Sequence, residues 1–407
     1  MAQNWLWMTA ADLGRGIAAG RINAMELTEA FLDAAAAHPE GARIYARMTP
    51  RRARSMAMAA ADRAKAGQRI GPLDGVPISW KDNIDAAGAA CEAGSALLRG
   101  RIPATDAVLL HNATAGGLVC LGKTHMSELA FSGLGLNPVT ATPPCVNDAM
   151  AVPGGSSSGA ATSVAFGLAP AAIGTDTGGS VRIPAAWNDL VGLKTTSGRL
   201  SLQGIVPLCP RFDTPGPLAR SVEDCALLLA AMEGRRPGDL EGATLKGARL
   251  GILETIALED LRAAPGTGFD TATDRLAKAG ARIERLAAPE VAEAMALAPL
   301  LFTSEAYGLW KPRIEAAPHL MYSRILERFR AGGTVNAADY VAAWQRLDTL
   351  RATWAARTAA YDAILVPTSP ILPPPAKRLL EDEAYYVGEN LLALRNTRIG
   401  NLMGGCD

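Results

Sequence analysis

The stretch Ala171–Ser180 reads AAIGTDTGGS and runs from a short apolar segment into a turn with two adjacent glycines. A second segment rich in glycine and serine, Gly154–Gly159 (GGSSSG), precedes it, and the mostly apolar residues 160–168 lie between the two. A flexible linker would border polar or proline-rich sequence. Because both segments lie within apolar sequence, we expect a buried strand at 171–173 and glycine turns that approach other groups closely.

Helix-like and strand-like patterns alternate outward from these turns. Thr9, Asn23 and Ser221 each stand three residues before an acidic residue, which is typical of a helix start. No internal repeat or obvious linker interrupts the alternation, so one large α/β domain is predicted. Strands are expected at 76–80, 117–122, 250–253, 281–286 and 363–367, and helices at 51–66, 160–167, 271–279 and through most of 289–360.

Composition excludes several classes of function. The 407 residues include 40 Lys plus Arg and 40 Asp plus Glu, whereas a protein that binds nucleic acid through phosphate contacts is expected to carry a basic excess. No apolar run approaches the ~20 residues of a membrane-spanning helix, and residues 1–5 do not resemble a secretory leader. The six cysteines form no close pairs. We therefore expect a cytoplasmic protein without a nucleic-acid or membrane partner, a disulfide framework or a metal site.

Three polar residues stand at the ends of apolar segments, namely Lys81, Ser156 and Ser180. Taken singly, each has an ordinary explanation as a surface lysine, a flexible loop or a plain turn. The apolar context favours chemistry instead. Successive glycines before Ser180 can direct backbone N–H groups into one small space, which is how an oxyanion hole is built. A serine at the end of such a turn is well placed to act as a nucleophile.

A serine nucleophile needs a base, and histidine is the commonest one. His125 is the only contender among the four histidines, but no acid near it has an evident orienting role, although Glu128 is three residues away. A lysine can replace histidine where burial lowers its pKa enough to leave the amine neutral. Lys81 follows an apolar strand, so it is the best candidate.

At this point the chain resembles the amidase signature family of hydrolases. The resemblance is strong over about residues 10–235 and looser over 236–405. It is carried by an ordered series of motifs: GPLDGVP (71–77), KDN (81–83), GKT (122–124) with Glu128, GGSS (154–157), GTDTGGS (174–180) with Arg182, Pro184 and Ala185, GLK (192–194), GR (198–199), DTPGP (213–217) and ARSVED (219–224).

The resemblance implies the amidase signature fold, in which helices cover both faces of a large, mixed and twisted β-sheet. The single domain 1–407 would comprise a helical segment at about 1–70, a catalytic core at about 71–235 and a more variable part at 236–407. After residues 401–405 the family usually continues with a strand pair and a final helix, and these are missing from the present sequence.

The resemblance also implies a Ser–Ser–Lys triad without a metal or cofactor. Ser180 would be the nucleophile, Ser156 the bridging serine in a cis peptide, and Lys81 the terminal base. Asp176 and Arg182 would brace the nucleophile turn rather than take part in the chemistry. The implied oxyanion donors are the backbone N–H groups of Thr177, Gly178, Gly179 and Ser180.

The substrate pocket of the family lies in the segment after Glu128 and in the variable region near 300–330. The implied substrate-binding residues are Phe131, Ser132, Gly133 and Tyr307. An apolar or aromatic acyl group would be favoured over a dicarboxylic amide if the pocket were lined by several of Phe131, Leu134, Leu136, Phe302, Tyr307, Leu309 and Trp310. The family has asparagine where His125 stands, which leaves the role of this histidine open.

Several functions remain open at this stage. The leading one is a stand-alone hydrolase of a small-molecule amide, with a homodimer left open. The second is the amidase subunit of a glutamine-dependent tRNA amidotransferase, but such subunits usually carry glutamine where Thr214-Pro215-Gly216 follows Phe212-Asp213. Urea-derived amides such as allophanate and carboxybiuret are further substrates of the family. A non-catalytic binding protein is disfavoured because all three triad residues are present.

Overall fold

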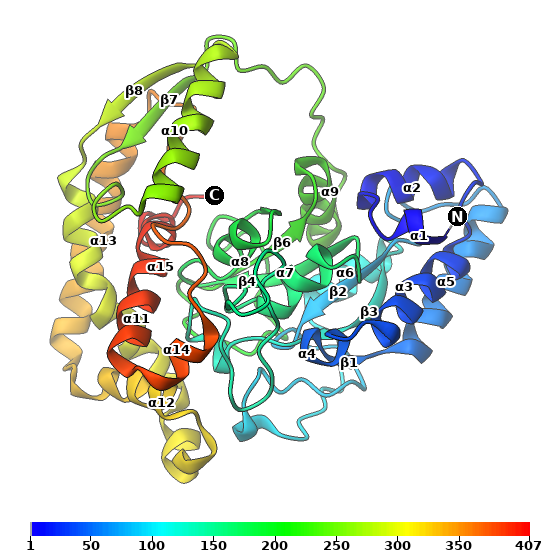
Figure 1. Cartoon of the computed structure of the whole chain (residues 1–407), viewed down its shortest axis with the longest axis horizontal. Coiled ribbons are helices and arrows are strands. Elements are labelled where there is room, and N and C mark those ends of the chain that lie inside the picture. The colour runs from blue at the N-terminus through cyan, green and yellow to red at the C-terminus, as the bar shows by residue number, and fades with distance from the viewer. Residues whose placement is uncertain (1) are drawn as a thin grey trace.

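The computed structural model describes residues 2–407, and its core is a six-stranded sheet in the order β1-β3-β2-β4-β6-β5 (Figure 1). The sheet is mixed, as predicted, because β2 runs parallel to β3 and β4 while the other pairings are antiparallel. The strands are β1 (Tyr45–Met48), β2 (Pro77–Lys81), β3 (Val119–Thr124), β4 (Ala171–Asp176), β5 (Val191–Gly192) and β6 (Thr214–Ala219).

Helices cover both faces of this sheet, which confirms the layered α/β fold. The larger layer contains α2 (Ala10–Ala18), α3 (Ala24–Ala37), α5 (Pro50–Lys65), α6 (Val108–Ala115) and α9 (Val222–Glu233). The opposite face packs against α7 (Ser158–Ala165) and α8 (Arg182–Trp187). The short helices α1 (Ala2–Trp5) and α4 (Gly41–Ile44) complete this half of the chain.

The predicted helix starts are confirmed by their hydrogen bonds. The side chains of Thr9, Asn23 and Ser221 each accept a hydrogen bond from a backbone amide two or three residues further along the chain. The first amides of a helix have no intrahelical partner, so these caps stabilise the helices that they begin.

A second sheet with the order β8-β7-β9 belongs to the C-terminal part of the chain, on the left in Figure 1. The predicted β–α–β unit is confirmed, since β7 (Arg249–Leu253), α10 (Ala263–Lys278) and β8 (Arg282–Leu286) follow one another and the two strands are parallel. The remaining elements are β9 (Ala363–Leu365), α11 (Pro289–Ala316), α12 (Ser323–Arg330), α13 (Ala337–Thr358), α14 (Ala376–Glu381), α15 (Glu383–Met403) and the 3-10 turns η1 (Ala96–Leu98), η2 (Glu128–Ala130), η3 (Pro318–Leu320) and η4 (Ala331–Thr334).

Helix α15 links the two parts of the molecule. It packs against α8 beside the central sheet and against α11, α13 and α14 of the C-terminal part. After α15, Asp407 exchanges two backbone hydrogen bonds with Lys194, just beyond β5. Within residues 2–407, no helix is both long enough and apolar enough to cross a membrane.

Candidate active site

Strand β2 places Lys81 on the same face of the sheet as α7. Side chains alternate along a strand, so Ser79 and Lys81 share one face while Ile78 and Trp80 point to the other. The hydroxyl of Ser79 lies 2.7 Å from that of Ser163 in α7, whereas Ile78 and Trp80 belong to the core beneath the larger helical layer. The lysine therefore points toward the Gly-Ser segment that precedes α7.

Lys81 is fully buried, and within residues 2–407 its Nζ forms hydrogen bonds with Ser156 and Thr175. This atom donates to Ser156 Oγ at 2.7 Å, to Thr175 Oγ1 at 2.8 Å and to the Thr175 carbonyl at 3.2 Å. Burial lowers the pKa of Lys81 to about 7, although the negative charges of Asp176 and Asp213 partly oppose the shift. A substantial fraction of the amine is therefore neutral at physiological pH.

Asp82 follows Lys81 directly, and its side chain points away from the lysine. Its carboxylate therefore does not hold a proton on Lys81. Its carboxylate lies 3.6 Å from Lys123 Nζ and 3.6 Å from the Arg47 guanidinium. The expected alternation at the end of β2 is thus confirmed, and Asp82 belongs to a separate buried charge cluster.

The segment that carries Ser156 is packed tightly enough to require glycine. The Gly155–Ser156 peptide bond is cis, as the family resemblance implied. A Cβ atom added at Gly155 would lie 2.6 Å from the backbone nitrogen of Gly135, far inside contact distance. Ser156 itself is fully buried, and its Oγ accepts the hydrogen bond from Lys81. The glycine therefore allows two backbones to meet next to the serine that contacts the lysine.

Ser180 lies at the end of the loop that follows β4 and lines a cavity. The backbone N–H groups of Thr177, Gly178 and Ser180 have no hydrogen-bond acceptor within residues 2–407. The structure differs from expectation for Gly179, whose N–H donates to Asp176 Oδ1 at 2.8 Å. The loop therefore offers three unpaired donors next to the Ser180 hydroxyl, which is the arrangement that stabilises an oxyanion.

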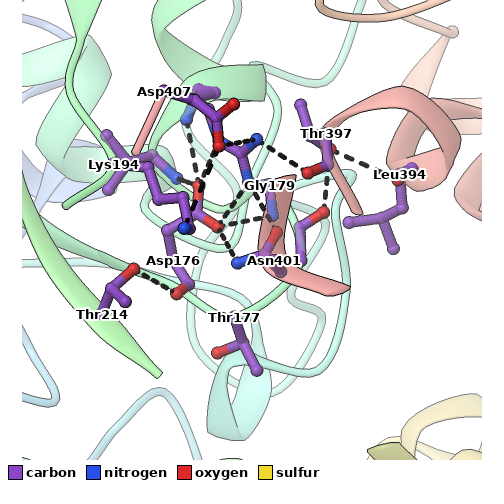
Figure 2. A network of polar contacts seen from close by, with 12 residues as sticks. Asp176, Thr177, Gly179, Lys194, Thr214, Leu394, Thr397, Asn401 and Asp407 are labelled. Carbon is purple, nitrogen blue, oxygen red and sulfur yellow. Dashed lines mark hydrogen bonds and ion pairs between the residues drawn. The ribbon is translucent and has the colours of Figure 1, made fainter. Parts of the chain in front are cut away.

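Asp176 and Arg182 brace this loop, and Figure 2 shows the polar network around Asp176. The Asp176 carboxylate accepts from the amides of Gly179 and Val181, from the Arg182 guanidinium and from Asn401 Nδ2. Burial alone would raise the pKa of Asp176, but the charge and hydrogen bonds of Arg182 hold it well below its usual range. Both groups are fully engaged with the scaffold, so their contribution to the site is positional.

Helix α15 closes this network from the C-terminal side. Thr397 Oγ1 donates to the Gly178 carbonyl at 2.8 Å, and Asn401 reaches Asp176 (Figure 2). Thr177 is held from the opposite direction, because its hydroxyl donates to Asp213 Oδ1. The nucleophile loop is therefore fixed both by its own sheet and by a helix more than 200 residues away in the sequence.

The cavity beside Ser180 has a volume of about 180 Å³. Its walls come from the nucleophile loop, from residues 130–132 and from α11, α12 and α15. Phe131 and Ser132 line it as expected, whereas Gly133 lies behind the wall, where its amide donates to Asn390 Oδ1 and its carbonyl accepts from the Gly155 amide. The cavity is lined by Ala130, Phe131, Ser132, Thr177, Gly178, Ser180, Leu208, Ala298, Pro299, Phe302, Thr303, Arg328, Leu391, Leu394 and Arg398.

Tyr307 does not line this cavity. It faces a different surface groove, and its hydroxyl donates to Glu315 at 3.0 Å. The position on α11 explains the difference, because Tyr307 follows Phe302 by five residues and so points to another side of the helix, where Lys311 lines the same groove. Of the seven apolar residues considered for the pocket, only Phe131 and Phe302 line it.

Some site residues were not singled out from the sequence. Thr175 contacts Lys81 and lies inside the motif GTDTGGS, directly before Asp176. Its position in this motif could have indicated a role at the site. Thr397, Asn401, Arg328 and Arg398 have no motif around them that indicates a role. They reach the site only because α12 and α15 pack there.

None of the four histidines lies at this site. His125 is partly buried, and burial lowers its pKa to about 4, so its ring is neutral at physiological pH. The backbone carbonyl of His125 accepts a hydrogen bond from the Gly159 amide. This contact places the residue beside the start of α7, apart from the cavity.

A serine beside unpaired amides, together with a buried lysine bonded to a second serine, supplies the kinds of group that nucleophilic hydrolysis requires. Residues 26–404 match the family described as Amidase, and the chain belongs to this family of amide-hydrolysing enzymes.

Curated relatives and solved structures agree with this assignment. The chain is 36% identical over 418 residues to 2-amino-5-chloromuconic acid deaminase of Comamonas testosteroni, covering 98% of this chain and 88% of the relative. It is 42% identical over 235 residues to a glutamyl-tRNA(Gln) amidotransferase subunit of Anaeromyxobacter sp. (strain K), covering 57% of this chain and 47% of that relative. A crystal structure of an amidase superimposes with a TM-score of 0.87 at 28% identity, covering 98% of this chain and 90% of the other.

Proposed function

We propose that this protein hydrolyses a carboxylic acid amide to the acid and ammonia or an amine through an acyl-enzyme on Ser180. Neutral Lys81 accepts the proton of Ser156, and Ser156 in turn takes the proton of Ser180. The Ser180 oxygen then attacks the amide carbonyl, and the amides of Thr177, Gly178 and Ser180 stabilise the resulting oxyanion.

The same relay returns its proton to complete the reaction. When the tetrahedral intermediate collapses, the C–N bond breaks and the leaving nitrogen takes a proton from Ser156, which is reprotonated from Lys81. A water molecule then attacks the acyl group on Ser180 and gives up a proton to the relay. The acid is released, and the hydroxyl of Ser180 is restored.

The 2.7 Å contact between Lys81 Nζ and Ser156 Oγ carries this proposal. An exposed lysine has a pKa near ~10.4 and is almost entirely protonated at neutral pH. Here burial brings the pKa to about 7, so the amine can serve as a base in the position where the relay needs one. The hydrogen bond therefore supports the relay.

A covalent probe tests the nucleophile directly. A fluorophosphonate should label the protein once, and peptide mass mapping should place the label on Ser180. The Ser180→Ala protein should not be labelled although it remains folded. A label on Ser156 or Ser158 would overturn the assignment, because both residues lie in the neighbouring Gly-Ser segment.

A second candidate function is the amidase subunit of a tRNA amidotransferase, favoured by the 42% identity over 235 residues. Thr214-Pro215-Gly216 opposes this reading, because these residues stand where such subunits usually carry glutamine. Ammonia release from glutamine that requires added partner subunits would support the amidotransferase. Ammonia release by the isolated chain from a panel of amides would support the hydrolase. The panel should include urea-derived amides and, in view of the deaminase relative, amino-substituted unsaturated acids.

A further inference from the structure

Two arginines enter the cavity beside Ser180 from different helices. Arg328 belongs to α12 and Arg398 to α15, and both are partly buried where they line the cavity. The Nε atom of Arg398 lies 3.9 Å from the position that a Cβ of Gly178 would occupy, so this guanidinium is close to the nucleophile loop. Thr397, the preceding residue, fixes the helix there by its hydrogen bond to the Gly178 carbonyl.

Neither arginine has a carboxylate partner among residues 2–407. Arg328 donates one hydrogen bond, to the Phe131 carbonyl at 3.1 Å, and its guanidinium lies 4.5 Å from the Phe131 ring centroid. Arg398 donates no hydrogen bond within the described chain and lies 5.8 Å from the centroid of Phe302. A guanidinium carries five donors. Most donors of this pair are therefore available to a molecule in the cavity.

The electrostatics of the pair are unfavourable without an anion. Burial, and then the like charge of Arg328, lower the pKa of Arg398 to about 9, and burial lowers the pKa of Arg328 as well. Both groups remain charged at neutral pH. Partly buried charges of one sign are costly unless an opposite charge is supplied, and no protein carboxylate supplies it here.

We propose that Arg328 and Arg398 bind a carboxylate on the acyl part of the substrate, which makes this enzyme specific for monoamides of short dicarboxylic acids. Guanidinium groups match carboxylates in shape and charge and can bind them through two parallel hydrogen bonds. This inference rests on the proposed function, because it identifies the acyl group that Ser180 would carry. It replaces the sequence-based preference for an apolar or aromatic acyl group. Of the residues on which that preference depended, only Phe131 and Phe302 line the cavity, and the two guanidinium groups add charge to its largely apolar walls.

The size of the cavity limits the length of the substrate. A cavity of about 180 Å³ is only slightly larger than an engineered protein cavity of about 150 Å³ that holds benzene. It therefore fits an acyl chain of a few carbons, whereas a long-chain or polyaromatic acyl group would have to extend beyond the cavity. The apolar walls formed by Phe302 and Leu394 would contact the middle of such a chain, between the amide at Ser180 and the carboxylate at the arginines.

Hydrolysis of matched amides tests the proposal. We expect the wild-type enzyme to hydrolyse succinamate or glutaramate with a kcat/KM at least about 100-fold higher than for succinamide or butyramide, which lack the carboxylate. Arg398→Gln and Arg328→Gln should each raise KM for the acidic amides about 10- to 100-fold, the range for a lost charge-assisted hydrogen bond. The loss for the neutral amides should be at least about tenfold smaller, so that the preference for acidic over neutral amides falls. Arg398→Lys should show a smaller rise in KM than Arg398→Gln, since lysine keeps the positive charge but cannot form the two parallel hydrogen bonds of a guanidinium.

A matched control separates this role from general effects of charge or stability. Arg395→Gln removes an arginine from the same helix, where the side chain contacts Ala257 and Asn396 rather than the cavity. This variant should leave KM for the acidic and the neutral amides unchanged. If Arg398→Gln lowered kcat equally for both kinds of amide, Arg398 would act on the oxyanion, and the carboxylate proposal would be overturned.

Binding without turnover keeps the test independent of catalysis. Calorimetry with the Ser180→Ala protein should detect succinate or glutarate but not succinamide, and Arg398→Gln should abolish the signal. Failure of every dicarboxylate to bind at millimolar concentration would overturn the inference even if Ser180 is labelled by a fluorophosphonate. An unlabelled Ser180 would instead reject the proposed function, so the two failures are distinguishable.

Discussion

The catalytic core and the C-terminal part reach the same cavity by different means. Every residue of β2, β3, β4 and β6 is buried, whereas β8 contains no buried residue and α10 has none either. Strands covered on both faces hold their ends rigidly, and Lys81 and the nucleophile loop lie at such ends. The C-terminal part contributes helix side chains instead. Chemistry is thus located on the buried sheet, and the cavity walls that select a substrate come mainly from packed helices.

The largest expected effect is removal of the proposed nucleophile in the core. Ser180→Ala should lower kcat/KM by at least about 10⁴-fold, because the acyl-enzyme can no longer form. Stability should change by less than about 1 kcal/mol, since the substitution shortens a side chain that borders a cavity. Ammonia release and urea unfolding measure the two quantities. Ser158→Ala is the matched control in the neighbouring segment and should remain active; an inactive Ser158→Ala protein with active Ser180→Ala would reverse the assignment.

The next effect concerns the base and its pH dependence. Lys81→Arg should lose about 10²- to 10⁴-fold in kcat/KM, because arginine stays protonated and cannot accept a proton. In the wild type, acid protonates Lys81, so kcat/KM should rise with pH along a limb centred near the lysine pKa of about 7 and then level off. A pH–rate profile measures this limb. Near-native turnover of Lys81→Arg would show that the lysine is only a positioning charge.

A smaller effect is expected on the brace that joins the two regions. Asp176→Asn removes the buried carboxylate partner of Arg182, which then keeps only the partly exposed Asp407 carboxylate at 3.2 Å. Breaking a buried pair in this way costs about 3–5 kcal/mol. The unfolding midpoint in urea should fall accordingly. Glu293→Gln breaks an exposed ion pair with Arg346 and should leave the midpoint unchanged. Equal shifts for the two variants would mean that the brace contributes no more than a surface pair.

His125 offers a still smaller effect inside the core. His125→Asn should keep kcat within about tenfold, or ~1.4 kcal/mol in the barrier, because the ring lies outside the cavity and has no carboxylate partner. Steady-state kinetics on any amide that the enzyme hydrolyses provide the measurement. A loss of a thousandfold or more would mean that a serine–histidine mechanism operates instead of the lysine relay.

The smallest effect is expected in α10, which has no buried residue. Asp274→Ala on this helix should change stability by less than about 0.5 kcal/mol and leave kcat/KM unaltered, since exposed positions without partners contribute little. Thermal unfolding and the same kinetic assay suffice. A clear loss of activity would show that the C-terminal part influences the buried sheet over a longer distance than its packing suggests.

The sequence by itself determined the features that depend on neighbouring residues. The mostly apolar residues 76–80 placed Lys81 at the end of a buried strand, and this feature is present. Glycines next to Ser156 and Ser180 indicated backbones that meet other groups closely, as Gly155 does. Helix starts at Thr9, Asn23 and Ser221 followed from caps that act over three residues. Such signals are local because strand alternation and capping hydrogen bonds extend over only a few positions.

Only the tertiary structure decided the walls of the cavity. Thr397 meets Gly178 although 219 positions separate them, and Arg328 and Arg398 enter the cavity through the packing of α12 and α15. Tyr307 lies outside the expected pocket for the same reason. The hydrogen bond from the Gly179 amide to Asp176 is different, because it spans only three positions of the chain. The direction of a side chain is set after distant elements have packed against one another. It depends on the sum of their contacts, and no local sequence pattern encodes this sum.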